Sequence, residues 1–123
     1  MKTILVVEDE PAIAEVLLQV LEQEGYKVVL AINGQHGLQQ LSEVKPDLVV
    51  SDLMMPVVTG AEMYHMMQSD PDIARIPLVL MSAAPVAPGF ALTGIIPAYI
   101  GFLRKPFDLD DLMQLIMMAI GAP

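Results

Sequence analysis

Short, almost purely apolar runs alternate along the chain with segments in which apolar residues recur every three or four positions. Apolar runs without polar alternation are typical of strands buried on both faces, as in a parallel sheet. Spacings of three and four are typical of helices with one buried face. The predicted strands cover residues 4–7, 26–31, 48–50, 78–81 and 102–103.

The helical segments carry recognisable start and stop residues. Pro11 suits the first turn of the first helix, and Gly25 is expected to end it. Asn33 and Asp108 are predicted to cap the second helix and the last one. The apolar residues assigned to the buried helix faces are Ile13, Val16, Leu17, Val20, Leu21, Leu38, Leu41, Met63, Tyr64, Met67, Leu109, Leu112, Met113 and Ile116.

Five strand–helix repeats predict an α/β fold of the (βα)5 type. Parallel strands need helical crossovers, and right-handed crossovers favour a doubly wound sheet with helices on both faces. We expect a flavodoxin-like parallel five-stranded sheet with strand order 2-1-3-4-5. With 123 residues, the chain is expected to form a single domain over 1–123.

Composition narrows the functional classes. The net charge of −9 argues against direct nucleic-acid binding and against an anionic membrane. The absence of cysteine excludes thiol catalysis and Cys-ligated zinc. The first apolar run is short and is followed at once by acidic residues, unlike a signal peptide. We therefore expect a cytoplasmic protein.

Chemically useful side chains follow four of the five predicted strands. Glu8 and Asp9 follow the first strand, Asp52 the third, Ser82 the fourth and Lys105 the fifth. In open α/β sheets, ligands bind beyond the carboxyl ends of the strands. Polar strand ends are common in themselves, but three acids, a hydroxyl and a lysine at one edge form a more specific pattern.

These residue types suit phosphoryl transfer. Three neighbouring carboxylates repel one another, so either some are protonated or a cation lies among them. An open, carboxylate-lined site suits Mg²⁺. Lys105 and Ser82 can contact phosphoryl oxygens, and Asp52 can act as the nucleophile that forms an aspartyl phosphate. The pattern predicts Mg²⁺-dependent phosphoryl transfer onto a carboxylate.

The motifs ILVVEDE, LVVSDLMMPVVTG, PLVLMSA and FLRKPF occur in this order along nearly the whole chain. With them the sequence resembles the receiver domains of two-component response regulators, including single-domain chemotaxis-type members. The resemblance implies that Asp52 is the phosphoacceptor. It also implies that Glu8, Asp9, Asp52 and the backbone carbonyl of Met54 hold Mg²⁺.

The resemblance further implies a switch. Ser82 and Lys105 would contact the phosphoryl group, Phe102 would be the aromatic switch residue, and the Lys105–Pro106 bond would be cis. The phosphodonor would be a sensor histidine kinase or a small acyl phosphate. Phosphorylation would change the surface formed by the fourth helix, the fifth strand and the last helix. Because the domain would release no product of its own, we do not expect an enzyme.

An uncharged stretch between Arg75 and Arg104 is unusual for this family. Its prolines and glycines argue against a membrane-spanning helix. We expect the region 85–100 to be irregular. We also expect an apolar face here, extended by Leu115, Met117 and Met118, that binds a downstream protein or a second copy of the chain. A mobile or better-buried loop is the alternative.

Three other functions fit parts of the pattern. A haloacid-dehalogenase-type phosphatase also uses an aspartyl nucleophile, but it needs a second Asp where this chain has Met54. A flavodoxin-type FMN carrier would need a hydroxyl-rich loop where this chain is acidic. A phosphorylation-independent interaction scaffold stays open, because a fold alone does not establish a function.

Met54 and Ala84 lie two residues beyond Asp52 and Ser82, at positions that in this family tune the placement of attacking water. Neither side chain can orient a water molecule. We predict slow autodephosphorylation, measured as the decay of the phosphoprotein after removal of the donor. The double variant Met54→Asn, Ala84→Glu should shorten the phosphoryl lifetime, and an unchanged lifetime would show that both are packing residues.

Overall fold

One parallel sheet forms the centre of the molecule. The computed structural model describes residues 1–52, 65–82 and 99–123, and for 99–102 it describes the backbone alone. Within these ranges the sheet has five strands in the order β2-β1-β3-β4-β5. The strands are β1 (Thr3–Val7), β2 (Lys27–Ala31), β3 (Leu48–Asp52), β4 (Leu78–Ser82) and β5 (Tyr99–Arg104). This topology confirms the predicted doubly wound, flavodoxin-like fold.

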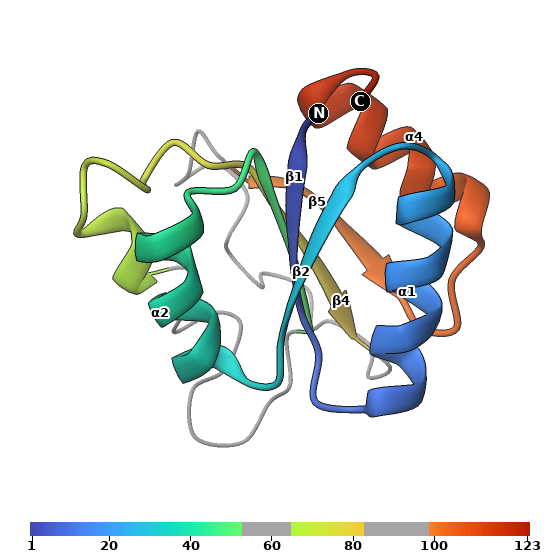
Figure 1. Cartoon of the computed structure of the whole chain (residues 1–123), viewed down its shortest axis with the longest axis horizontal. Coiled ribbons are helices and arrows are strands. Elements are labelled where there is room, and N and C mark those ends of the chain that lie inside the picture. The colour runs from blue at the N-terminus through green and yellow to red at the C-terminus, as the bar shows by residue number, and fades with distance from the viewer. Residues whose placement is uncertain (53–64, 83–98) are drawn as a thin grey trace, which may run out of the picture.

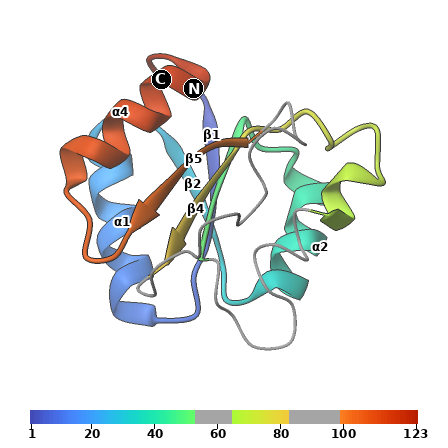
Figure 2. The same ribbon diagram turned by 180° about the vertical axis from the view of Figure 1, so that it is seen from behind.

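Helices cover both faces of the sheet. Helices α1 (Pro11–Gln23) and α4 (Leu109–Ile120) lie on one face, and α2 (Gly34–Val44) lies on the other (Figures 1 and 2). Residues 65–68 are helical as well. Of the helices described, none is long and apolar enough to cross a membrane.

Successive strand residues belong alternately to two apolar cores, one on each face of the sheet. Leu5, Val7 and Val49 pack on the α2 side together with Leu41. Their neighbours in the same strands pack on the α1 and α4 side, for example Val6. Strands with apolar residues on both sides are required because each face is covered by helices. This explains the unbroken apolar runs of the sequence.

The predicted helix boundaries are confirmed where they rest on capping chemistry. The Asn33 side chain accepts the His36 N–H at 2.8 Å, and Asp108 accepts the Asp110 N–H at 2.9 Å. Pro11 lies in the first turn of α1. Gly25 follows the helix with a φ of 101°, a left-handed conformation that favours glycine.

Two predicted core positions are wrong. Val16 is 51% exposed and Leu109 is 39% exposed. In α1 the buried positions are Ala14, Leu17 and Leu21, so a small alanine takes an inward position while Val16 faces outward. Apolar spacing marks a broad helix stripe, and only packing decides which edge of that stripe is covered.

The fifth strand is longer than predicted. β5 begins at Tyr99, so residues 99–100 of the segment predicted to be irregular are extended. The pairing with β4 shifts by one residue between Leu78 and Val79, whose partners are Tyr99 and Gly101. The rest of the 85–100 segment lies outside the described residues, as do Met54, Met63, Tyr64 and Ala84. The side chain of Phe102 is also outside them.

Both termini lie at the end of the sheet where β1 begins (Figure 1). The hydroxyl of Tyr26, a residue that is 2% exposed, donates to the Gly121 carbonyl at 2.8 Å. The Lys2 ammonium donates to the Ile120 carbonyl. These bonds satisfy carbonyls that the end of a helix leaves without partners.

Removing the Tyr26 hydroxyl tests how much its hydrogen bond to the Gly121 carbonyl contributes to the stability of the fold. Tyr26→Phe removes the donor to the partly buried Gly121 carbonyl, so we expect a loss of about 1 kcal/mol in the free energy of unfolding. Urea unfolding followed by circular dichroism measures that loss. Amide exchange should accelerate in the last turn of α4 and stay unchanged in α1. Equal stability of the two proteins would show that solvent replaces the hydroxyl.

Candidate functional site

The carboxyl ends of the strands bring the predicted site residues to one edge of the sheet. Glu8 and Asp9 follow β1, while Asp52 and Ser82 are the last residues of β3 and β4. The backbone N–H of Lys105 donates to the Ser82 carbonyl at 2.7 Å, which ties the end of β5 to that of β4. The Lys105–Pro106 bond is cis, as the family resemblance implied.

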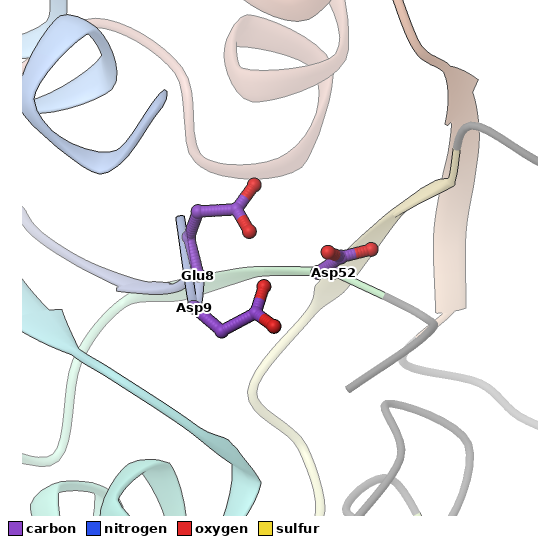
Figure 3. Close-up of side chains that lie close together, drawn as sticks. All are labelled: Glu8, Asp9 and Asp52. Carbon is purple, nitrogen blue, oxygen red and sulfur yellow. The ribbon is translucent and has the colours of Figure 1, made fainter. Parts of the chain in front are cut away.

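Three carboxylates converge at this edge. Glu8, Asp9 and Asp52 each offer an oxygen, and these oxygens lie within 4.8 Å of one another. Figure 3 shows the three side chains pointing toward a common space between the strand ends. Glu8 and Asp52 are buried at 2% and 7% exposure, whereas Asp9 is exposed. The cluster therefore has a buried floor and a side open to solvent.

Lys105 is the cation of this cluster. Its ammonium donates to Glu8 Oε1 and, at 3.3 Å, to Asp52 Oδ2. The side chain of Glu8 is fully buried, and that of Lys105 is 11% exposed. The other Glu8 oxygen, Oε2, accepts the Glu10 N–H at 3.4 Å. Buried charges are stable only when they are paired and hydrogen-bonded, and both conditions are met here.

Burial sets the proton affinity of Glu8. Desolvation raises the pKa of Glu8 from 4.5 to about 7, although the hydrogen bond and the charge of Lys105 act in the opposite direction. For Lys105, burial alone lowers the pKa, but the hydrogen bond and charge of Glu8, with Asp52, raise it above its ordinary value. Lys105 is thus held as a cation, and Glu8 titrates close to neutrality.

The donor set fits a hard divalent cation. Three carboxylates from two strand ends, one of them exposed, offer the oxygen ligands that Mg²⁺ takes while keeping several of its waters. Ser82 lies at the same edge and is 1% exposed. The structure thus brings together Glu8, Asp9, Asp52, Ser82 and Lys105. Two residues assigned by resemblance, Met54 and the Phe102 side chain, lie outside the described residues.

An apolar groove adjoins the carboxylates. It encloses about 570 Å³ between α1 and the segment that joins β5 to α4. Its lining residues are Glu10, Ala12, Ile13, Val16, Leu17, Lys105, Pro106, Phe107 and Leu109. Both wrongly predicted core residues, Val16 and Leu109, belong to this wall. Sequence reasoning missed the groove because apolar groove walls and core faces have the same helical spacing.

The chain belongs to the response regulator receiver domain family, whose pattern it matches over residues 4–117. The response regulator Rre1 of Synechocystis is 34% identical over 93% of this chain, which corresponds to 49% of Rre1. The chain spans about half the length of the first curated relatives that it matches.

Solved structures agree with this assignment. The chemotaxis protein CheY4 of Vibrio cholerae superposes with a TM-score of 0.87 at 25% identity, covering 98% of this chain and 99% of that one. TrrA of Thermotoga maritima, solved in complex with Mg²⁺ and BeF, superposes with a TM-score of 0.82 at 29% identity. It covers 98% of this chain and 100% of its own.

Glu8 should make the stability of the fold depend on pH. The folded protein holds the Glu8 proton to about pH 7, whereas an ordinary glutamate loses it near 4.5. Ionisation of Glu8 therefore opposes folding, and this contribution to stability falls as pH rises through that window. We expect a loss on the order of 2 kcal/mol, which the Glu8→Gln variant should not show.

Urea unfolding in EDTA at pH values between 5 and 8 measures this effect. The wild-type protein should lose more stability than Glu8→Gln across that range, and Asp72→Asn, which changes an exposed aspartate away from the strand ends, should follow the wild type. If the free energy of unfolding changed with pH in the same way for the wild type and Glu8→Gln, the assignment of the raised pKa to Glu8 would be contradicted.

Proposed function

We propose that this receiver domain is a phosphorylation-activated switch of a two-component system, with Asp52 as the phosphoacceptor. One observation carries the proposal: the Asp52 carboxylate lies 3.3 Å from the Lys105 ammonium and within 4.8 Å of two further carboxylates. A carboxylate with a cation on one side and a set of metal-binding oxygens on the other suits attack on a phosphoryl group.

The residues divide the chemistry among them. An Asp52 oxygen forms the new P–O bond while the bond between phosphorus and the donor breaks, and the donor leaves with the electron pair. Lys105 and Ser82 would hold the transferred oxygens. Glu8, Asp9 and Asp52, with the Met54 carbonyl, would hold Mg²⁺, which supplies charge stabilisation between the two reacting anions.

The phosphodonor we propose is a phosphohistidine of a sensor histidine kinase, with a small acyl phosphate as a substitute. Receiver domains as a family accept phosphoryl groups from such kinases, which supports this kind of partner. The apolar groove supports a protein donor, because it is continuous with Lys105 and offers Val16 and Leu109 as exposed apolar contacts. A domain of this kind passes on a signal and releases no product, so we do not assign it an enzymatic role.

The signal would leave through a surface formed by the predicted fourth helix, which lies outside the described residues, by β5 and by the last helix, α4. On α4, Met117 and Met118 are 48% and 70% exposed, consistent with an apolar face for a downstream protein or a second copy of the chain. Reorientation of Phe102 would alter this face after phosphorylation, as a shift between two populated states. A phosphorylation-independent scaffold is the competing function, and it would leave the paired charges of the site without a role.

Intact mass after incubation with acetyl phosphate and MgCl₂ tests the proposal. The wild type should gain one phosphoryl group, and EDTA should abolish the gain. Asp52→Asn should gain none, because an amide is a poor nucleophile. Asp72→Asn changes an exposed aspartate away from the strand ends and should behave as the wild type. Modification of Asp52→Asn to the wild-type extent would overturn Asp52 as the acceptor.

A further inference from the structure

The Tyr26 hydroxyl lies between two acceptors at the end of α4. It donates to the Gly121 carbonyl at 2.8 Å, and the Met117 sulfur lies 3.6 Å from the same hydroxyl oxygen. A tyrosine hydroxyl has one proton and a thioether sulfur is a weak acceptor, so the carbonyl takes the hydrogen bond. The bond to Gly121 therefore depends on Met117 remaining a poor acceptor.

This bond is one of several contacts that hold residues 121–123 at the end of the sheet where β1 begins (Figure 1). The Gly121 N–H donates to the Met117 carbonyl at 2.9 Å and closes the last turn of α4. Pro123 packs against Gly25 so closely that a Cβ atom on Gly25 would lie 3.1 Å from the proline ring. Residues 121–123 are thus attached both to α4 and to the turn between α1 and β2.

Met117 is open to chemical modification, because it is 48% exposed. Hydrogen peroxide converts a thioether to a sulfoxide. The sulfur electron pair forms an S–O bond, the O–O bond breaks, and the leaving oxygen takes the proton of the transferred one and departs as water. The sulfoxide is polar, and its oxygen accepts hydrogen bonds far better than the thioether sulfur. An oxygen bonded to the Met117 sulfur can come within hydrogen-bond range of the Tyr26 hydroxyl.

We infer that Met117 is a redox-sensitive modification site that controls how residues 121–123 are held. After oxidation the Tyr26 hydroxyl donates to the sulfoxide oxygen instead of the Gly121 carbonyl, and residues 121–123 come away from Gly25. Reduction by a methionine sulfoxide reductase restores the original bond. The three carboxylates lie at the opposite end of the sheet, so this inference goes beyond the proposed function and does not depend on it (Figure 1).

The backbone of Gly121 reports the change directly. In wild-type protein treated with hydrogen peroxide, the carbonyl ¹³C NMR signal of Gly121 should move toward its position in Tyr26→Phe, which lacks the hydroxyl. Amide exchange at Gly121 should accelerate about fivefold, the factor that corresponds to the loss of one hydrogen bond. Exchange at Ile116, which is buried in α4, should stay unchanged. Both Gly121 changes should follow the fraction of Met117 sulfoxide measured by peptide mass spectrometry, and treatment with the reductase should reverse them.

Met118 supplies a matched control, because it is the next residue of α4 and is 70% exposed. Met118→Leu keeps Met117 and should respond to peroxide as the wild type does. Met117→Leu should show no change at Gly121, although its Met118 is oxidised. Both substitutions exchange apolar side chains of similar volume, so both variants should fold. In Tyr26→Phe, oxidation of Met117 should bring no further acceleration at Gly121, because there is no hydroxyl to redirect.

Three results would overturn the inference. The first is an equal response of Met117→Leu and Met118→Leu at Gly121. The second is an unchanged Gly121 signal in wild-type protein whose Met117 is fully oxidised, a result that does not depend on the folding of any variant. The third is a Met117 that remains a thioether while Met118 is fully converted.

Discussion

The ion pair between Glu8 and Lys105 is the interaction on which the functional edge depends. Three carboxylates lie at the ends of two strands, and one of them is completely removed from water. Without a nearby cation, such a cluster would repel itself or remain protonated. Lys105 compensates the charge while being bound to the end of β4 through its own backbone. Lys105 thus offsets part of the cost of burying the Glu8 carboxylate, and its backbone joins the same site to the end of β4.

The doubly wound fold is what makes this arrangement possible. All five strands of the described sheet run parallel, so their carboxyl ends meet at one edge, and the central strands β1, β3 and β4 are almost entirely buried between the helices. Residues at and just beyond the strand ends therefore differ in exposure: Asp52, the last residue of β3, is buried, whereas Asp9 faces solvent. One side of the cluster is thus open to solvent, while Glu8 and Asp52 form its buried side.

The groove beside Lys105 adds a second property to the same edge. Its walls are apolar, and Val16 and Leu109 are exposed in it, although their spacing in the sequence is that of core residues. Exposed apolar side chains next to a charged site can bind the surface of a macromolecule, and the charged residues then lie close to the groups of that macromolecule. A protein phosphodonor of the kind proposed above would use both.

The sequence by itself determined the element order, the strand order and the set of polar residues at the strand ends. Apolar runs, caps such as Asn33 and the rule that parallel strands share a carboxyl edge are local or topological signals. Tertiary structure alone decided that Lys105 bonds Glu8 and Asp52, that these two carboxylates are the buried ones, and that Val16 and Leu109 line a groove. These outcomes depend on distances and solvent exclusion between segments far apart in the chain, and no periodicity along the sequence carries that information.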